Sequence, residues 1–444
     1  MNRWLVVVGA ILIQLCLGAI YAWSVFTKVL VKEPYNFTET QTQMIFSVAL
    51  ATFAVFTIIG GRWQAKVGPT LVARVGGIVL AVGYTAGGLV ERVMPHQMFP
   101  GILMTIGLIG GIGIGLAYVV PIACGVKWFP DKKGLVTGLA VAGFGFGALI
   151  WIKLADPGAG RLLVTLGLSN VWLVYGISYF VLVMIGSLWM VNPPPGWVPA
   201  GWSGSADKTG ATAAAQIDLE PRQMLGTPQF WTLWVMYISG ALAGLMVIGI
   251  VQLFAIDALR KGSGLTSLQA SALAATAAGI FLPIFNGLGR IVWGYISDAI
   301  GRKAAMLLML VLQGVTLLSF FYMGGTPALL YIGAASVGFN FGGTLALFPT
   351  ITADYFGSRN FGRNYGWMFT AYGVGGIVGP IMAGIFKTAG KAAVKGGADE
   401  AAALNAAMNA WSPAFIIAGL ACLAAAVLGL FLRAPRTASS PRAT

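Results

Sequence analysis

Residues 270–303 read ASALAATAAGIFLPIFNGLGRIVWGYISDAIGRK, a long apolar run with a single basic residue at its heart, Arg290, and a polar end. No acidic residue lies between Ala270 and Ile296 to neutralise that guanidinium. A helix needs about 20 apolar residues to cross a bilayer, so this run is long enough. A charge in the middle of such a helix is costly and normally marks a substrate or ion pathway. We therefore predict that the missing counter-charge is a small transported anion.

The rest of the chain has the same character. Of 444 residues, 58% are hydrophobic and only 9% are charged, and the mean hydropathy is +0.84. A soluble domain could not bury that much apolar surface. The apolar runs are continuous rather than alternating, which indicates membrane helices and not a barrel. We predict twelve spans, at residues 4–27, 43–65, 71–90, 98–125, 134–154, 171–191, 230–256, 270–296, 304–323, 327–353, 364–386 and 411–432.

One polar segment divides these spans into two sets of six. Residues 192–229 begin with an Asn-Pro-Pro-Pro run and continue through a Gly/Ser/Ala-rich stretch, which is typical of a linker. Within it, Asp218 to Leu225 is expected to form a short surface helix. We predict an all-α integral membrane protein made of two six-helix bundles, residues 1–191 and 230–433, with a tail at 434–444.

The net charge of +14 reflects membrane orientation rather than a nucleic-acid partner. With the amino terminus inside, 16 of the 27 basic residues fall on the cytoplasmic side and ten on the outer side, and Arg290 alone lies between. Loops on the cytoplasmic side normally carry this excess. We expect a multi-pass protein of the cell membrane with both termini in the cytoplasm. All 13 acidic residues are expected in loops or at helix ends.

An internal repeat supports the division into halves. The turn after the second span reads Gly61-Arg62-Trp63-Gln64-Ala65-Lys66-Val67-Gly68, and the turn after the eighth contains Gly294-Tyr295-Ile296-Ser297-Asp298-Ala299-Ile300-Gly301-Arg302-Lys303. Repeated halves around a central site are how many secondary carriers achieve alternating access.

At these turns the chain resembles the major facilitator superfamily, whose signature Gly-x-x-x-Asp-x-x-Gly-Arg-Lys is intact in the second copy. The resemblance implies twelve helices with pseudo-two-fold symmetry and gating roles for Gly294, Asp298, Gly301 and Arg302. We expect Asp298 to face the positive amino-terminal end of helix 11. Such a contact would act as a latch that locks the outward-open state. Because Ala65 stands in the place of the acid in the first copy, the corresponding latch there should be weaker.

A narrower resemblance, to the oxalate/formate antiporter family, rests on words in the same order along nearly the whole chain: Asn2-Arg3-Trp4, Gly18-Ala19-Ile20-Tyr21-Ala22-Trp23-Ser24, Lys127-Trp128-Phe129-Pro130-Asp131-Lys132-Lys133-Gly134-Leu135, Thr227-Pro228-Gln229-Phe230-Trp231, Phe348-Pro349 and Arg363-Asn364-Tyr365-Gly366. It implies a carrier of small carboxylates in which the helix 8 arginine, here Arg290, clamps the carboxylate.

Other pocket positions follow from the same resemblance. Tyr21 and Tyr118 match pocket tyrosines, and Phe341 and Leu345 occupy positions where the oxalate exchanger has larger aromatics. Tyr372 is the main departure, because the exchanger has a second cation, a lysine, at that point. One cation would leave a dianion half neutralised, so the sequence favours a monocarboxylate such as lactate, pyruvate or formate.

The residues themselves agree with a carboxylate ligand. A guanidinium binds a carboxylate through two parallel hydrogen bonds. Asn286 lies one helical turn before Arg290, on the same face, and can address the same ligand. Asn340 in the tenth span is a further candidate. The tyrosine hydroxyl of Tyr372 could hold a hydroxyl, a keto oxygen or the second carboxylate oxygen.

Several alternatives stay open at this point. Arg290 could be a structural cation held by backbone carbonyls, and the tyrosines could be packing aromatics. Transport could be proton symport or anion exchange, with oxalate-type exchange as the second substrate class, and an anion channel or a carboxylate sensor are rival functions. We expect no enzyme activity, cofactor, metal or nucleic-acid partner, and a protein that works as a monomer in the lipid bilayer. The glycine runs 110–115 and 143–147 are expected to pack helices, not nucleotides.

Overall fold

The computed structural model describes residues 2–155, 161–195, 197–199, 218–396 and 399–435. Its elements are all helical within these ranges: α1 (Trp4–Leu17), η1 (Gly18–Ala22), α2 (Trp23–Leu30), α3 (Glu39–Val67), α4 (Pro69–Val93), η2 (Pro95–Gln97), α5 (Met98–Ile102), η3 (Leu103–Gly110), α6 (Gly111–Trp128), α7 (Lys133–Ala155), α8 (Leu162–Ser187), α9 (Pro221–Leu225), α10 (Pro228–Ser263), α11 (Ser267–Thr276), η4 (Ala277–Phe281), α12 (Leu282–Ile300), α13 (Arg302–Met323), α14 (Pro327–Phe356), α15 (Phe361–Met368), α16 (Thr370–Gly396) and α17 (Glu400–Leu430).

Twelve helical segments in the described ranges are long and apolar enough to cross a membrane, as the sequence predicts. Some spans join several elements; α11, η4 and α12 form one span from Ser267 to Ile300. Most predicted boundaries lie within a few residues of those in the structure, and the largest differences are at the starts of the sixth and twelfth spans. The sixth span covers Leu162–Ser187 instead of residues 171–191, and the twelfth covers Glu400–Leu430 instead of 411–432. Alanine-rich turns of high helix propensity extend the twelfth helix beyond its apolar run.

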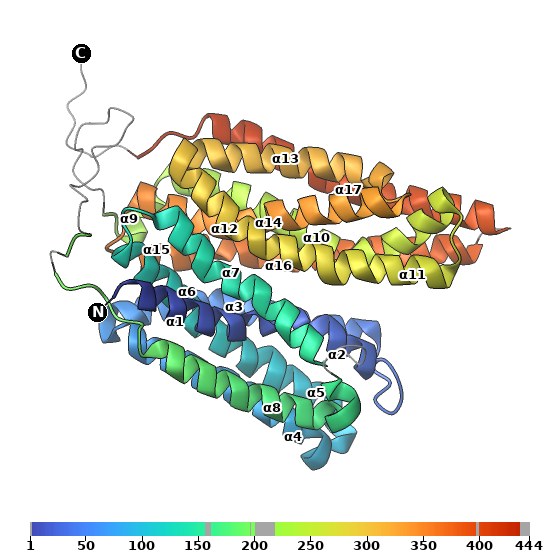
Figure 1. Cartoon of the computed structure of the whole chain (residues 1–444), viewed down its shortest axis with the longest axis horizontal. Helices are drawn as coiled ribbons and strands as arrows, with labels where there is room; N and C mark the ends of the chain where they lie inside the picture. The colour runs from blue at the N-terminus through green and yellow to red at the C-terminus, as the bar shows by residue number, and fades with distance from the viewer. Residues whose placement is uncertain (1, 156–160, 196, 200–217, 397–398, 436–444) are drawn as a thin grey trace.

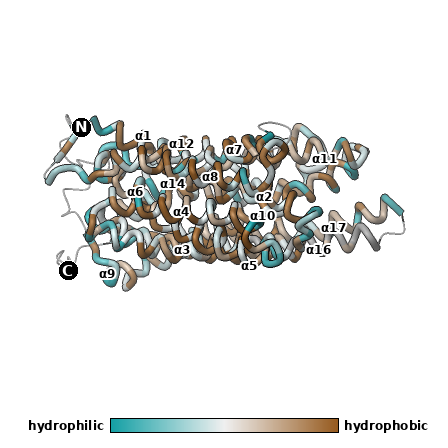
Figure 2. Tube along the Cα trace, turned by 90° about the horizontal axis from the view of Figure 1, so that it is seen from below, coloured by the Kyte–Doolittle hydropathy of each residue, from teal (hydrophilic) through white to brown (hydrophobic). Residues whose placement is uncertain are grey.

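The helices form two groups. Figure 1 shows α1–α8, in blue to green, gathered on one side, and α10–α17, in yellow to red, on the other. We call these groups the first and second bundles. Figure 2 shows hydrophobic residues along the length of the bundles and hydrophilic residues gathered towards the two ends. The end at which α1 begins and α17 ends is called the terminal side, and the opposite end the distal side.

The expected surface helix before the seventh span is present as α9, Pro221–Leu225. Glu220 caps it, and the Arg363 guanidinium pairs with the Glu220 carboxylate at 2.8 Å. Half of the predicted linker, residues 196 and 200–217, and the last nine residues of the predicted tail, 436–444, lie outside the described residues.

Glycines in α7 let this helix approach two neighbours at once. A Cβ on Gly143 or Gly147 would lie within 2.8 Å of backbone atoms of α1, and one on Gly145 would lie 3.1 Å from the Asn286 side chain of α12. Gly143 and Gly147 are four residues apart and share a face, whereas Gly145 points to the other side. The glycine run is therefore a packing device, as the sequence predicts, and it brings α7 of the first bundle against α12 of the second.

Candidate functional site

Arg290 lies on α12 at the interface of the two bundles and is completely buried. Its Nε and Nη2 atoms donate to the Asn286 side-chain oxygen at 3.1 and 3.0 Å, and its Nη1 atom donates to the Val141 carbonyl of α7 at 2.7 Å. Within the described part of the chain no carboxylate pairs with the guanidinium. Three polar contacts orient the cation and leave its charge without a counter-ion, in a place where an isolated charge is costly.

The first bundle supplies the surface that faces this cation. The guanidinium carbon lies 5.6 Å from the centre of the Phe144 ring, within the range of a cation–π contact. A Cβ on Gly138 would lie 2.3 Å from the Arg290 carbonyl, so the α7 backbone passes very close to α12 at this level. The site therefore depends on both bundles, and separating them would remove two of the contacts that hold the guanidinium.

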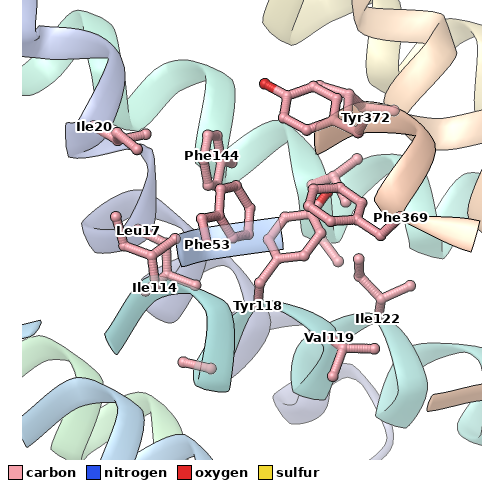
Figure 3. Packing of buried hydrophobic residues seen from close by; sticks show 14 of the residues in the cluster. Leu17, Ile20, Phe53, Ile114, Tyr118, Val119, Ile122, Phe144, Phe369 and Tyr372 are labelled. Atoms are coloured by element: carbon pink, nitrogen blue, oxygen red, sulfur yellow. The ribbon is translucent and has the colours of Figure 1, made fainter. Parts of the chain in front are cut away.

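A cluster of aromatic rings from both bundles adjoins Arg290. The Phe53, Tyr118 and Phe144 rings of the first bundle contact one another, and Phe53 and Tyr118 each contact Phe369 of the second, with ring centres 4.9 and 4.7 Å apart. Figure 3 shows these rings gathered together, with Tyr372 beside Phe369; Tyr118 meets Phe53 and Phe144 edge to face. The rings exclude water from the interface and so strengthen electrostatic interactions there.

Tyr21 and Tyr372 join the bundles directly through a hydrogen bond between their hydroxyl groups. Tyr21 lies in η1, where the first span departs from α-helical geometry, and its ring packs 5.2 Å from Phe144. The structure thus brings Arg290, Asn286, Tyr21, Tyr118 and Tyr372 to one level of the interface.

The sequence did not identify several groups of this site. Tyr237 and Tyr365 both contact the Phe369 ring of the aromatic cluster, with ring centres 6.4 and 5.8 Å apart, and their hydroxyls are 3.3 Å apart. Phe144 and the Val141 carbonyl are the other missed groups. The glycines on either side of Phe144 could have drawn attention to it, because they place its ring on a helix face that packs closely against neighbours.

Three further predicted residues are buried on α14. The Phe341 ring fills the space beside Gly244 of α10, where a Cβ would lie 2.1 Å from a ring carbon, and Leu345 is buried one turn further along α14. The Asn340 side chain lines a groove between α12, α13 and α14. No hydrogen bond within the described residues connects any of them to Arg290.

The expectation that Asp298 faces helix 11 is wrong. Its carboxylate oxygens accept hydrogen bonds from the Gly134 and Leu135 amides at 3.0 and 2.8 Å. These amides belong to the first turn of α7, the fifth span, where backbone N–H groups have no partner within the helix. The carboxylate therefore caps a positive helix end in the opposite bundle, as expected, but the helix is the fifth and not the eleventh. The sequence does not reveal which helix end lies opposite Asp298.

Ion pairs extend this contact along the terminal side. Arg302 pairs with Asp298 at 2.6 Å and with Asp354 at 2.7 Å, and Asp354 also accepts from Lys133 of the first bundle at 2.7 Å. A Cβ on Gly294 would lie 2.3 Å from the Gly134 carbonyl, so only glycine allows the two helices to meet here. Gly301 begins α13 with a positive φ of 89°, which favours glycine. The terminal side is closed in this structure.

The corresponding contact of the first repeat has no acid. A Cβ on Gly61 of α3 would lie 2.0 Å from the Gly362 carbonyl of α15, and the Arg62 guanidinium carbon lies 5.3 Å from the centre of the Trp367 ring. Ala65 is exposed. On this side α3 contributes packing and a cation–π contact but no carboxylate; the acids near the start of α15 are Asp218, which accepts from the Arg359 amide, and Glu220, which pairs with Arg363.

One acid lies further inside a helix than the sequence indicates. Asp257 is in α10, about one and a half turns before the helix ends at Ser263, and its carboxylate accepts from the Trp411 indole at 2.9 Å. The helix has 36 residues, many more than the about 20 needed to cross a bilayer. Asp257 therefore lies near the distal end, far from Arg290.

Known proteins resemble this chain over most of its length. An uncharacterized MFS-type transporter of Escherichia coli (strain K12), YhjX, is 29% identical over 376 residues, which cover 85% of this chain and 86% of that protein. An oxalate:formate antiporter of Oxalobacter formigenes is 27% identical over 433 residues, 97% of this chain and 91% of that protein. The apicoplast pyruvate carrier 1 of Toxoplasma gondii is 26% identical, with 83% and 81% covered.

Solved structures share the fold. The proton:xylose symporter XylE superposes with a TM-score of 0.65 at 15% identity, covering 98% of this chain and 96% of that chain. The transporter FucP in the outward conformation gives a TM-score of 0.62 at 14% identity, covering 96% and 98%. The family model of the Major Facilitator Superfamily matches residues 10–288 and 266–444. With twelve apolar helices, this fold and a match along almost the entire sequence, the chain is a multi-pass membrane transporter that belongs to the Major Facilitator Superfamily.

Proposed function

We propose that this transporter moves small monocarboxylate anions, of the lactate, pyruvate or formate type, by alternating access. The observation that carries the proposal is the fully buried Arg290 guanidinium, which is held by Asn286 and the Val141 carbonyl and has no acidic partner among the described residues. A carboxylate that enters the interface supplies the missing charge and accepts charge-assisted hydrogen bonds.

Relatives support the substrate class. An oxalate:formate antiporter and a pyruvate carrier are among the similar proteins, and both names denote small carboxylates. The substrates in these names differ in charge, since oxalate is a dianion whereas formate and pyruvate are monoanions. The relatives alone therefore support a carboxylate and leave its charge to be argued from the site.

The site favours a monoanion because it offers one cation. Tyr372 stands opposite Tyr21 and donates or accepts a neutral hydrogen bond. A dianion bound there would keep one uncompensated negative charge in an interface of low dielectric, which costs several kcal/mol in order of magnitude. Exchange of a dicarboxylate such as oxalate is the second candidate, favoured by the similarity to the oxalate:formate antiporter.

In the proposed cycle the two bundles, residues 1–191 and 230–433, rock around Arg290. The terminal side is assigned to the cytoplasm because the loops there carry the excess of basic residues, and the chain is assigned to the cell membrane. The anion reaches the site from the distal side and neutralises the Arg290 guanidinium. The bundles can then pass through the arrangement that is closed on both sides without the cost of burying an uncompensated charge. Coupling occurs by proton symport or by exchange for a second anion.

Counterflow in proteoliposomes tests the proposal. Purified protein is reconstituted with internal lactate, pyruvate, formate, acetate or oxalate, and uptake of labelled lactate is followed with and without a pH gradient. Monocarboxylates are expected to drive uptake better than oxalate. A dependence on the pH gradient without internal anion identifies symport, and a strict requirement for internal anion identifies exchange. Strong preference for oxalate contradicts the monoanion assignment, and failure of every carboxylate contradicts the proposal as a whole.

A further inference from the structure

Gln64, in the last turn of α3, faces the start of α15 across the interface of the two bundles. The residue is buried, with only 7% of its surface exposed. A Cβ on Gly362, the second residue of α15, would lie 2.0 Å from the Gln64 Nε2 atom. The Gln64 amide therefore lies directly against the first turn of a helix in the opposite bundle, on the terminal side.

The second repeat makes the same contact with a different side chain. In the two signature turns Gln64 and Ser297 both occupy the fourth position. A Cβ on Gly134, the second residue of α7, would lie 2.7 Å from the Ser297 Oγ atom. The fourth residue of each turn thus touches the second residue of the helix that begins opposite it. Gly362 is therefore the structural counterpart of Gly134.

The two helix starts differ in what their amides bind. The Gly134 amide donates to the Asp298 carboxylate at 3.0 Å. The Gly362 amide has no acceptor among the described residues, and the side chain of Asn360, at the N-cap position, makes no capping hydrogen bond. First-turn amides have no partner within their own helix. The first repeat therefore leaves a donor free where the second repeat binds a carboxylate.

The Gln64 side chain carries the matching acceptor. Its Oε1 atom is buried and accepts no hydrogen bond within the described residues, although buried side-chain polar atoms are normally paired. A half turn of the amide exchanges Oε1 and Nε2 without changing the outline of the group. This rotation places the oxygen against Gly362, where Nε2 now lies. We propose that Gln64 is a gating residue that replaces the missing acid, with Oε1 accepting from the Gly362 amide when the terminal side closes.

A neutral latch differs from the Asp298 latch in strength and in its response to pH. Hydrogen bonds to an ionised acceptor are roughly twice as strong as neutral ones, so the contact between α3 and α15 releases more readily than the contact between α12 and α7. A glutamine also keeps the same charge at every pH. The role of Gln64 rests on the rocking of the bundles in the proposed function, but it depends on no particular substrate.

Spin labels on the full-length protein in lipid vesicles test this role without any transport assay. The labels are attached at Lys66→Cys and Arg359→Cys, which are exposed, whereas the native cysteines are buried. Gln64→Leu removes the amide at similar size. The ratio of the short to the long distance should fall about two- to tenfold, as expected for one neutral hydrogen bond. Gln97→Leu makes the same change at an exposed glutamine of the distal side and should leave the ratio unchanged.

Gln64→Glu separates a hydrogen-bonding role from a packing role. At neutral pH its carboxylate faces the positive end of α15, so the ratio should rise above that of the unmodified labelled protein. The closed state favours the ionised form, and the gain is therefore lost as the pH falls through the glutamate pKa to about 4. The unmodified labelled protein, measured at each pH, corrects for the other ionisable groups of α3 and of the segments around α15, which are Arg62, Asp218, Glu220 and Arg363.

Two results overturn the proposal: an unchanged ratio in Gln64→Leu while Gly294→Ala populates the long distance, or a rise in Gln64→Glu that persists at low pH. If Gln64→Leu does not fold, Gln64→Glu decides alone. If Gly294→Ala and every Gln64 variant keep only the short distance, the bundles do not part, and the gating role and the rocking cycle both fail. If the distances change as stated while no carboxylate supports counterflow, the gating role stands and only the substrate assignment fails.

Discussion

Tyr372 is the position at which a single substitution should change the preferred charge of the substrate. Tyr372→Lys places a second cation on the same side of the interface as Arg290, beside Tyr21. We expect the ratio of oxalate to lactate counterflow to rise at least about tenfold, which corresponds to about 1.4 kcal/mol. Tyr372→Phe, the matched control, removes the hydroxyl without adding charge and should keep the preference for monocarboxylates. An unchanged ratio in Tyr372→Lys would contradict the charge argument.

Asn286 offers a second test, because its oxygen lies 3.0 Å from Arg290 Nη2. Asn286→Asp replaces a neutral acceptor by an internal carboxylate that competes with the substrate for the guanidinium. Lactate counterflow should fall by about tenfold or more, since hydrogen bonds to charged groups contribute about 1.5–3 kcal/mol. Asn286→Ala, which only frees the guanidinium, should lose less. Equal activities of the two variants would show that Arg290 does not bind the anion.

Much of this site could be predicted from single residues. The groups that the sequence did not reveal are those that join the site only when distant helices pack together. The pairing of Asn286 with Arg290 follows from their spacing of one turn, and the lack of an acid partner is visible in the sequence. The Val141 carbonyl, Phe144 and the tyrosines 237 and 365 join the site only through packing between helices that are distant in the chain. Asn340 looks similar to Asn286 in sequence, yet it borders α12 and α13 and no hydrogen bond within the described residues joins it to Arg290, because the rotation of α14 is set by its neighbours.

The α7–α12 contact makes a testable prediction about helix packing. Gly294→Ala adds a methyl group where a Cβ would lie 2.3 Å from the Gly134 carbonyl, so the terminal side should close less well. Spin labels at Lys66→Cys and Arg359→Cys, both exposed, report the separation of the bundles there. We expect a longer distance to become populated.

Gly279→Ala is the control for this substitution. It adds the same methyl group in the same span, where no atom lies within 4 Å. The short distance should remain dominant in this variant. If both variants give the same distance distribution, the glycine contact does not limit closure.

The positions of the helices in the sequence are predicted better than the contacts between them. Continuous apolar runs specify the twelve spans, because the bilayer sets their length. The starts of the sixth and twelfth spans were misplaced, since the helices begin at Leu162 and Glu400 instead of at residues 171 and 411, and alanine-rich turns account for the longer twelfth helix. The helix end that Asp298 caps was also misassigned. The helix end that a carboxylate caps is the one that lies next to it in the folded protein. The sequence of the turn shows the carboxylate but not its neighbouring helix.

The whole transporter has two unequal latches on its terminal side. Asp298 caps α7, whereas Ala65 supplies no carboxylate from α3 to α15. Ala65→Asp should add an acid near a positive helix end, worth about 0.3–1 kcal/mol. The closed terminal side should become more populated, by about two- to fivefold, in the spin-label experiment, with a slower turnover. A control, Ala65→Asn, lacks the charge and should change the distances less; an equal effect would rule out an electrostatic latch.

In the proposed cycle, both latches and the proposed anion site act on one equilibrium, the relative orientation of the bundles. Closure brings Val141 and Phe144 to Arg290 while it brings Gly134 to Asp298. An anion that neutralises Arg290 therefore favours the compact arrangement through which the site must pass. This coupling explains why a carrier can move slowly when empty and rapidly when loaded.

The most direct test of the account removes the buried charge itself. Arg290→Gln keeps polar hydrogen-bonding groups and eliminates the cation, and Arg92→Gln makes the same change at an exposed arginine. Lactate counterflow into proteoliposomes is measured for both variants and for the unmodified protein, after equal reconstitution is verified. The account predicts that counterflow is abolished in Arg290→Gln and retained in Arg92→Gln. Saturable lactate counterflow of undiminished rate and affinity in Arg290→Gln would contradict it.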